Sequence, residues 1–337
     1  MNFPLYPDQP TALCQNRMQV YSVTQETPDV WTLSLISHDV YPYQSGQFAL
    51  VNIGQSVDIQ RAYTLSSTPG LSRFIQLTVR RIDDGEGSGW LTQQVKPGDY
   101  LWLSDAQGEF TCETPQPLLL LAAGCGVTPV MSIARRVLAH SPAQSVQVFY
   151  SVRSPQDVIF AQEWQRMAAQ YPQLRLTILA ENDAAPGQIA GRLSQDLLQG
   201  LVADIAARRV MICGPAPYME LAGKWAAELG VPRQNIVKEQ FQATEVVVSA
   251  DQQLTLTRLT PLANFRVPVG STLLAAMEQH KLPVMAACRA GVCGSCKTRV
   301  LSGDYTTTSR MTLTDEEVAQ GYVLACSCQL QGDVTLA

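Results

Sequence analysis

The stretch Ala287–Cys296, which reads ACRAGVCGSC, decides how the last part of this chain folds. Its cysteines Cys288, Cys293 and Cys296 are spaced C-x4-C-x2-C, and a fourth, Cys326, follows far downstream. This is the ligand pattern of a plant-type [2Fe–2S] cluster. The small residues between the cysteines let the backbone wrap closely, so that amide N–H groups can point at the sulfurs and tune the reduction potential. The spacing therefore predicts an iron–sulfur loop with these four cysteines as metal ligands.

Other interpretations of the cysteines stay open from spacing alone. Structural zinc sites favour paired C-x2-C steps, and only one such step is present; unliganded core thiols are the second alternative. We expect Cys326 to lie on a strand, with Cys328 two residues later on the same face. Ligation is assigned to Cys326 and packing to Cys328.

Composition and charge exclude several classes of protein. The chain has 337 residues, 46% of them hydrophobic, so two or three domains with sizeable cores are expected. The formal net charge of −5, without a basic tract, argues against nucleic acid and anionic membrane surfaces as partners. The nine cysteines are an odd number, no signal peptide is recognisable, and the longest apolar run, Leu118–Ala123, is too short for a membrane span. We therefore expect a cytoplasmic protein.

The chain divides into five segments. After an N-terminal segment, 1–16, short alternating strands and turns at 17–112 predict an antiparallel β-barrel. At 113–241, apolar strands alternate with amphipathic helices, which predicts an α/β domain with a parallel sheet. A polar linker is expected at 242–251, and a third domain at 252–337.

Two motifs of the first domain suggest a ligand site. Arg61 and Tyr63 face the same side of an expected strand, where they can grip one ligand by its phosphate and its aromatic or ribityl part. The glycine-dense turn Gly85–Leu91 leads into a helix start whose N–H groups suit a pyrophosphate. Taken alone, the first motif is equally an exposed ion pair with an edge aromatic, and the second an ordinary hairpin.

Two turns of the second domain follow expected strand ends. Ala122–Pro129 runs from a strand into a helix, and Met211–Met219 does the same further on. The first is not the G-x-G-x-x-G fingerprint, because Pro129 stands where the third glycine belongs. Each turn alone could be a plain βα connection, but two at strand ends of one domain favour a dinucleotide cleft.

These motifs resemble, in order and spread, those of the ferredoxin-NADP reductase superfamily. The matching strings are Arg61-x-Tyr63-Thr64, Gly87-Ser88, Gly124-x-Gly126-x-Thr128-Pro129, Cys213-Gly214-Pro215 and Glu239-x-Phe241. With the cysteine module, the chain after about residue 16 is similar to the reductases that serve the hybrid cluster protein. The resemblance implies a β-grasp (α+β) ferredoxin-like third domain.

The resemblance also implies roles for individual residues. Arg61 binds a flavin phosphate, Tyr63 packs on the isoalloxazine or ribityl, and Thr64 hydrogen-bonds near flavin N5. Many relatives have serine at that last place, and threonine keeps the hydroxyl. The other implied flavin contacts are Thr78, Val79 and Arg80 along the ring, Gly87 and Ser88 at the phosphate, and Glu239 and Phe241 on the far side. Gly126 and Thr128 face the nicotinamide dinucleotide, with Cys213 near the carbon that gives up hydride, and Gly214 and Pro215 are further implied cofactor-binding residues.

The choice of nucleotide exposes a conflict. Arg153, after the second strand, points to NADP by the general rule for such domains. NADP-specific superfamily members typically add a Lys-x-Tyr anchor, however, and this chain contains none. Since the resemblance also implies NADH, we predict NADH as cosubstrate, with FAD and a [2Fe–2S] cluster as cofactors.

The predicted function is an NADH:acceptor oxidoreductase. Hydride carries two electrons and an iron–sulfur cluster accepts one, so a flavin is expected between them. By resemblance, the acceptor is the hybrid cluster protein. The alternatives are an aromatic-ring dioxygenase reductase that uses FMN, and a non-catalytic redox sensor. Arg289, Lys297 and Arg299 flank the cluster loop, which suggests either an acidic patch on the partner or a solvated charged rim.

Overall fold

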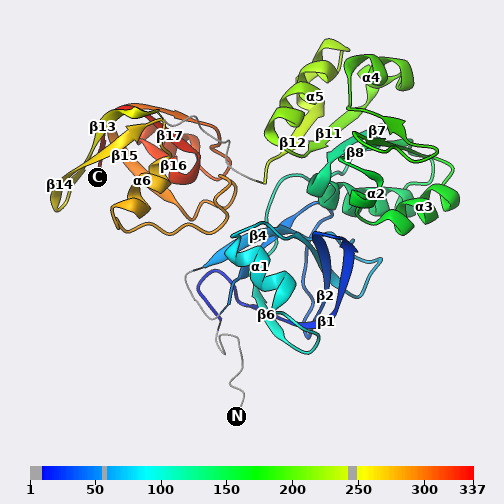
Figure 1. Cartoon of the computed structure of the whole chain (residues 1–337), viewed down its shortest axis with the longest axis horizontal. Coiled ribbons are helices and arrows are strands. Elements are labelled where there is room, and N and C mark those ends of the chain that lie inside the picture. Colours follow the sequence, from blue (N-terminus) through cyan, green and yellow to red (C-terminus); the bar gives the residue numbers. More distant parts are fainter. Residues whose placement is uncertain (1–9, 55–58, 242–248) are drawn as a thin grey trace. The chain divides into compact units, whose positions relative to one another are not determined.

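The computed structural model describes residues 10–54, 59–241 and 249–337 of the chain (Figure 1). Their contacts form two compact units. The first holds a barrel and a parallel-sheet domain and extends to Gln240; the second begins at Phe241, and the short segment at the start of strand β4 groups with it. Most of the predicted linker 242–251 and of the predicted N-terminal segment 1–16 falls outside the described residues.

Six strands form the barrel, in the order β4-β3-β6-β1-β2-β5. Their bounds are β1 Asn16–Thr27, β2 Val30–Ser37, β3 Phe48–Asn52, β4 Gln60–Thr64, β5 Ile75–Arg80 and β6 Tyr100–Leu103. A bridge between Leu65 and Leu77 joins the end of β4 to β5 and closes the sheet on itself. Leu33, Leu35 and Leu77 are fully buried, as alternate residues of strands with one face on a core should be. Helix α1 (Glu86–Gln93) follows β5.

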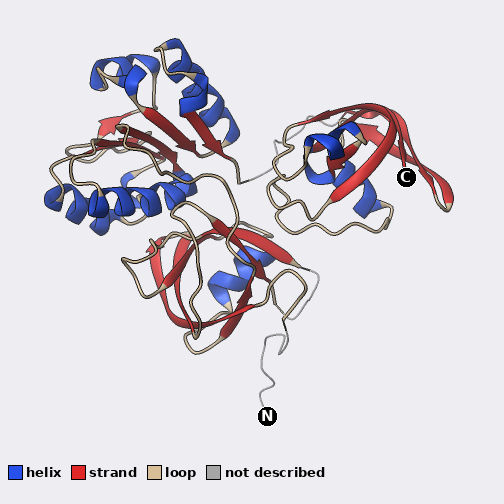
Figure 2. Cartoon of the chain, turned by 180° about the vertical axis from the view of Figure 1, so that it is seen from behind, coloured by secondary structure: helices blue, strands red, loops and turns tan. Residues whose placement is uncertain are grey.

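The second domain is a parallel sheet in the order β10-β9-β8-β7-β11-β12. Its strands are β7 Leu118–Ala123, β8 Val146–Val152, β9 Leu174–Ala180, β10 Ile189–Ala190, β11 Arg209–Cys213 and β12 Ile236–Glu239. Its helices are α2 Val127–His140, α3 Ala161–Gln170, α4 Gln195–Leu201 and α5 Ala216–Glu228, with short 3₁₀ turns η1 Gly124–Gly126, η2 Pro155–Asp157, η3 Ile205–Ala207 and η4 Arg233–Asn235. Figure 2 shows the helices on both sides of the strands.

Burial on both faces explains the continuous apolar run of β7. Leu118 and Leu120 belong to the core under α2 and α3, and Leu119 and Leu121 to the core under α4 and α5. The chain order places β8 on one side of β7 and β11 on the other. The carboxyl ends of β7 and β11 therefore flank the point where the strand order reverses, which is where open α/β sheets bind their ligands.

The second unit is a mixed five-stranded sheet, β14-β13-β17-β15-β16, packed against a helix. Its elements are β13 Ser249–Leu259, β14 Leu262–Val269, α6 Leu273–Gln279, β15 Lys297–Thr307, α7 Asp315–Ala319, β16 Tyr322–Leu324, η5 Ala325–Ser327 and β17 Cys328–Leu336. β13 and β17 pair in parallel and the other strands pair antiparallel. The predicted fold class, a barrel, a parallel α/β domain and a β-grasp domain, is confirmed. The expectation that Cys326 lies on a strand is wrong, because it sits in the 3₁₀ turn η5.

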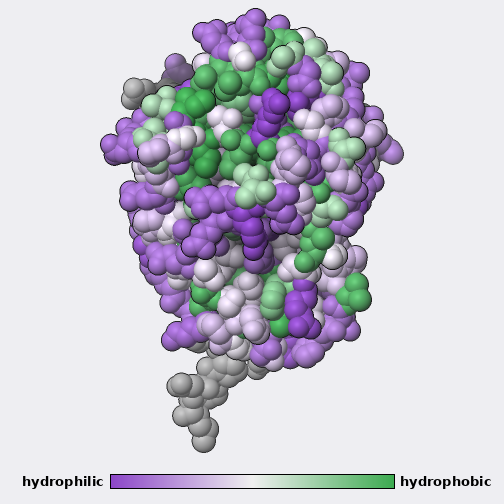
Figure 3. Space-filling view, turned by 90° about the vertical axis from the view of Figure 1, so that its right-hand side faces the viewer, coloured by the Kyte–Doolittle hydropathy of each residue, from purple (hydrophilic) through white to green (hydrophobic). Residues whose placement is uncertain are grey.

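Among the described residues, no helix is long and apolar enough to cross a membrane. The face seen in Figure 3 is hydrophilic over most of its area, and its apolar residues gather in the upper part.

Candidate functional site

The four predicted cluster ligands lie together in the second unit. Cys288 is within hydrogen-bonding reach of both Cys293 and Cys326, and the Sγ atoms of Cys296 and Cys326 are 3.3 Å apart. Three of these side chains are buried, and Cys293 is partly exposed. The loop that carries three of the cysteines and the turn η5 that carries the fourth thus bring all four thiols to one place.

Backbone amides of the loop point at these sulfurs. The N–H of Gly291 donates to Cys326 Sγ at 3.1 Å, and the N–H groups of Ala290 and Val292 donate to Cys288 Sγ at 3.4 and 3.5 Å. Gly291 has φ 75°, and a Cβ there would lie 2.7 Å from the Cβ of Ser309, so only glycine fits. The small residues of the loop therefore do what the sequence predicted.

The thiols and amides fit a [2Fe–2S] cluster. A hydrogen bond from Cys293 lowers the pKa of Cys288, and one from Cys326 lowers the pKa of Cys296. The pKa values of the two donors, Cys293 and Cys326, are raised. Four thiolates so close together need positive charge to balance them, and bound iron supplies it. Two irons that share the four sulfurs would supply that charge.

Cys328 stands apart from this set. It opens strand β17, is fully buried, and burial raises the pKa of its thiol to about 12, with a smaller contribution from Cys296. This surrounding suits a packing thiol.

In the barrel, the predicted flavin residues lie on β4 and β5. Arg61 and Tyr63 are both partly buried on β4, and Nη1 of Arg61 donates to the carbonyl of Gln60 at 2.8 Å. Thr64, at the end of the strand, is 6% exposed. The alternation of a strand gives Arg61 and Tyr63 a common side, opposite to that of Thr64.

The side chains of Thr78 and Val79 are engaged within the protein. The hydroxyl of Thr78 lies 2.9 Å from that of Thr32 and 2.8 Å from that of Ser66, and Val79 is buried in the barrel core. Sequence reasoning missed this row of hydroxyls, since it joins residues far apart in the chain.

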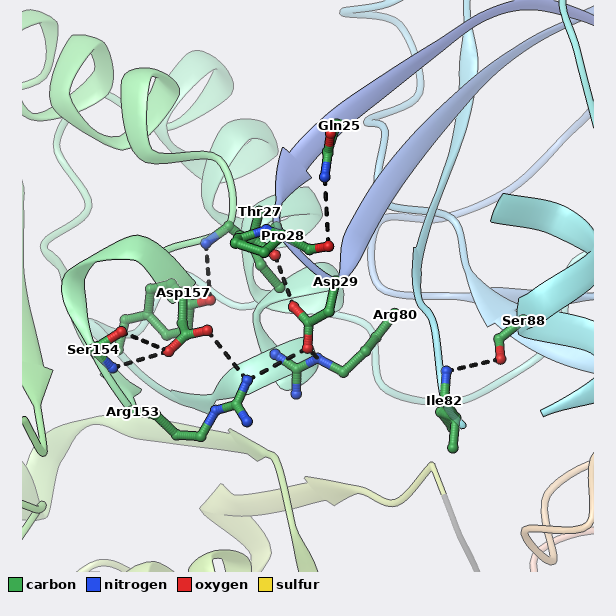
Figure 4. A network of polar contacts seen from close by, with 12 residues as sticks. Gln25, Thr27, Pro28, Asp29, Arg80, Ile82, Ser88, Arg153, Ser154 and Asp157 are labelled. Carbon is green, nitrogen blue, oxygen red and sulfur yellow. Dashed lines mark hydrogen bonds and ion pairs between the residues drawn. The ribbon is translucent and has the colours of Figure 1, made fainter. Parts of the chain in front are cut away.

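The glycine-dense turn forms the start of helix α1. The Ser88 hydroxyl accepts from the N–H of Ile82 at 3.1 Å (Figure 4). It also donates to the carbonyl of Gly85 at 3.2 Å, so it stabilises the turn. Gly87 lies in the first turn of α1, where N–H groups have no intrahelical partner. Beside the turn is a cavity of about 870 Å³, lined by Ile53, Gly54, Arg81, Ile82, Asp83, Asp84, Gly85, Glu86, Gly89, Trp90, Gln93 and Gln94.

A network of charges joins the barrel to the parallel-sheet domain (Figure 4). Arg80 Nε lies 3.2 Å from Asp29 Oδ2, and Nη2 of Arg153 lies 3.4 Å from the same oxygen and 3.2 Å from Asp157 Oδ1. The guanidinium of Arg80 also packs over Gly124, where a Cβ would be 3.2 Å from Nη1. Sequence reasoning missed both aspartates. The capping pattern Ser-x-x-Asp that ends at Asp157 was the available signal for one of them.

A second join runs from helix α2 to the loop after β4. Ser132 Oγ donates to the carbonyl of Ser67 at 2.5 Å, and Nη1 of Arg135 donates to the carbonyl of Ser66 at 2.6 Å. Thr68 Oγ1 donates in return to the carbonyl of Ser132 at 2.9 Å. No sequence motif indicated these contacts. They fix the loop that follows Thr64 against the nucleotide domain.

The two glycine turns meet at the reversal point of the parallel sheet. A Cβ on Gly126 would lie 2.0 Å from the carbonyl oxygen of Cys213, so the η1 turn can approach the end of β11 only with glycine here. A Cβ on Gly214 would meet that of Ala123 at 3.0 Å, and Pro215 caps helix α5. The Thr128 hydroxyl donates to the carbonyl of Cys125 at 3.0 Å.

Cys213 and Glu239 end adjacent strands, β11 and β12, and are paired in register. Burial, and secondly the neighbouring Glu239, raises the pKa of Cys213 well above its usual value, so this thiol stays neutral. Burial also raises the pKa of Glu239 from its usual 4.5 to about 8, and its Oε2 has no hydrogen-bond partner. A buried acid with an unpartnered oxygen, at the edge where such sheets bind ligands, makes Glu239 a candidate functional group. Phe241 is 39% exposed and groups with the second unit.

Glu239→Gln is expected to remove a pH dependence of stability. Because the folded pKa is raised, the folded carboxyl keeps a proton that the unfolded chain releases, and the free energy of unfolding falls as the pH rises from about 5 to about 8. Glutamine does not titrate, so the melting temperature of the variant minus that of the wild type should increase as the pH rises through this window. Melting curves from pH 5 to 9 measure the difference, with the exposed Glu228→Gln as control; parallel curves would contradict the assignment.

Comparisons with known proteins agree with this architecture. Residues 120–224 match the oxidoreductase NAD-binding domain family and residues 260–331 the 2Fe-2S iron-sulfur cluster binding domain family. Phthalate dioxygenase reductase, 22% identical, has the same fold, with a TM-score of 0.66 over 95% of this chain and 97% of that one. The glycine betaine monooxygenase reductase subunit of Chromohalobacter salexigens is 29% identical over 93% of this chain and 92% of its own length.

A curated relative is much more similar. NADH oxidoreductase HCR of Escherichia coli K12 is 58% identical over 330 residues, which are 97% of this chain and 99% of the relative. Identity of this degree over both whole lengths, with the NAD-binding and 2Fe-2S domains in place, means that the chain belongs to the family of NADH oxidoreductase HCR.

Proposed function

We propose that this protein is an NADH-dependent oxidoreductase that passes electrons through FAD and a [2Fe–2S] cluster to a protein acceptor. The observation that carries the proposal is that one chain holds both a parallel sheet with two glycine turns at its reversal point, as in dinucleotide-binding domains, and a four-cysteine site. The first suits a two-electron donor and the second a one-electron carrier. A bound flavin exchanges electrons with both kinds of partner.

The chain's own residues position the reacting groups. Gly126 and Gly214 let the two turns pack closely on the strand ends at the reversal point, where the nicotinamide would bind. Cys213 and Glu239 border this point, and burial favours the neutral form of both. Holding donor and acceptor about 3 to 3.5 Å apart is the main contribution a protein makes to such a transfer. The contacts of α2 with the loop after Thr64 keep the barrel at a fixed place in that geometry.

The proposed flavin site extends from β4 to helix α1. Arg61, Tyr63 and Thr64 would contact the ring and its phosphate side, Thr78, Val79 and Arg80 would border it along β5, and the amides of Gly87 and Ser88 would hold the phosphates. The cavity beside α1, about 870 Å³, is large enough for an adenine nucleotide, which supports FAD over FMN. Chromatography of the extracted flavin tests this choice. FMN would favour the alternative of a dioxygenase reductase component.

We propose the hybrid cluster protein as the acceptor, on the strength of the sequence resemblance and the similarity to NADH oxidoreductase HCR. Of the three cations near the cluster loop, Arg289 is paired with Glu278 and Lys297 with Glu317. This pairing lowers the positive field there, so an acidic patch on the partner loses its main support. Iron–sulfur chemistry and nine cysteines that form no disulfide suit a cytoplasmic location.

The decisive experiment is a visible spectrum of the purified protein before and after NADH, followed by the hybrid cluster protein under anaerobic conditions. We expect NADH to bleach both the flavin and the cluster bands, and the partner to restore them. No bleaching, with no NADH-driven reduction of ferricyanide or cytochrome c, would favour the non-catalytic sensor instead. Bleaching without reoxidation by the hybrid cluster protein would refute the acceptor and leave the reductase activity standing.

A further inference from the structure

Arg153 lies where a nucleotide domain reads the adenosine ribose of its ligand. It follows strand β8 directly, at the carboxyl end of the strand next to β7. An acidic side chain at this place favours NAD, and an arginine favours the 2′-phosphate of NADP. The Arg153 side chain is 65% exposed, so its charge is within reach of a bound nucleotide.

Two carboxylates hold the guanidinium of Arg153, as Figure 4 shows. Its Nη2 lies 3.2 Å from Oδ1 of Asp157 and 3.4 Å from Oδ2 of Asp29. Asp157 is fixed in turn, because its Oδ2 accepts from the N–H and the hydroxyl of Ser154 at 3.1 and 2.9 Å. The 3₁₀ turn η2 therefore presents this carboxylate to Arg153 in a defined orientation.

Asp29 reaches the same arginine from the barrel. The hydroxyl of Thr27 donates to its Oδ1 at 2.9 Å, and Arg80 Nε lies 3.2 Å from its Oδ2. Its backbone carbonyl also accepts from the N–H of Arg81 at 2.8 Å. The formal charges of Asp29, Arg80, Arg153 and Asp157 sum to zero, so the charge of Arg153, which by the general rule points to NADP, is balanced by carboxylates of the protein itself.

We propose that Asp157 and Asp29 determine nucleotide specificity by occupying Arg153. A 2′-phosphate brought to this arginine meets two carboxylates and must displace at least one of them, whereas the uncharged 2′-hydroxyl of NADH can donate to a carboxylate. Asp157 is thus a positioning residue that acts through Arg153. The inference deepens the proposed function and rests on its use of NADH.

Asp157→Asn tests the proposal, because asparagine keeps the shape and can still accept from Ser154 while it loses the charge. We expect the ratio of kcat/KM for NADPH to that for NADH to rise about fivefold, equivalent to the ~1 kcal/mol that an exposed charge pair is worth. Adding Arg153→Ala to this variant should cancel the gain, since the freed arginine is its source. Glu228→Gln, which removes an equal charge from a pair with Lys224 on α5, should leave the ratio unchanged.

Calorimetry with 2′-AMP and 5′-AMP gives a readout that needs no turnover. Asp157→Asn should tighten 2′-AMP relative to 5′-AMP by a similar factor. An unchanged ratio in both measurements, a gain that survives Arg153→Ala, or a wild type that uses both nucleotides equally would each overturn the inference. A wild type that reduces ferricyanide with neither nucleotide would instead refute the proposed function, and the binding comparison would still decide the role of Asp157.

Discussion

Cys326→Ser is expected to remove the [2Fe–2S] absorption and to lower NADH-driven reduction of cytochrome c by at least about 100-fold. Loss of a residue that only hydrogen-bonds a metal ligand already lowers activity by up to about 100-fold, and Cys326 is itself an expected ligand. The Cys326 sulfur contacts both Cys288 and Cys296 and receives the Gly291 amide, so no other side chain can replace it. Reduction of ferricyanide should persist, because the flavin and the nucleotide cleft lie upstream of the cluster. Iron and sulfide analysis, visible spectra and both assays measure the effect.

Cys328→Ser is the matched control for this experiment. It makes the same chemical change two residues away, at a fully buried thiol that begins β17. We expect its cluster content to equal that of the wild type, with some loss of stability from a polar hydroxyl in the core. A cluster that survives in Cys326→Ser but is lost in Cys328→Ser would reverse the ligand assignment.

Gly126→Ala is expected to slow reduction of the flavin by NADH about 100-fold, as a displacement near 1 Å does in such sites. The new Cβ would lie 2.0 Å from the Cys213 carbonyl oxygen, 2.3 Å from its carbon and 2.7 Å from the Gly214 nitrogen. These are backbone atoms of a buried strand end and cannot move aside cheaply, so overpacking should also cost about 1–3 kcal/mol of stability. Stopped-flow flavin reduction and thermal unfolding test the two effects.

Gly200→Ala provides the comparison within the same domain. Gly200 lies in helix α4, exposed, and a Cβ there meets nothing within 4 Å. Alanine should stabilise the helix by about 0.5–1 kcal/mol and leave flavin reduction unchanged. If Gly126→Ala behaved like Gly200→Ala, the close approach of the η1 turn to the end of β11 would not be needed for hydride transfer.

Local patterns were sufficient to predict the parallel-sheet domain. Strand β7 was recognisable because a run of four leucines suits a strand buried on both faces, and the glycine turns after β7 and β11 were recognisable because strand and helix periods change there. The cysteine spacing likewise identified the cluster loop. In each case the decisive residues lie within about ten positions of one another, where physical constraints are visible in the sequence.

The errors and omissions involve contacts between distant residues. Cys326 and Cys328 were expected on one strand, yet Cys326 lies in a 3₁₀ turn, where Ser327 Oγ donates to the carbonyls of Leu324 and Ser309 at 3.1 Å each. Arg153 pointed to NADP by the general rule, and the sequence did not reveal its contact with Asp29, which lies 124 positions away. Periodicity and spacing carry no information on such pairs.

The contacts between helix α2 and the barrel have a consequence for how the protein can change. Ser132 and Arg135 bond to the backbone carbonyls of Ser67 and Ser66, groups that every residue type carries. Side chains in that loop can therefore be exchanged without breaking these two bonds. Substitutions in the loop after Thr64 therefore need no matching substitutions at Ser132 or Arg135. The distance between the barrel and the parallel-sheet domain can stay the same while the sequence of this loop changes.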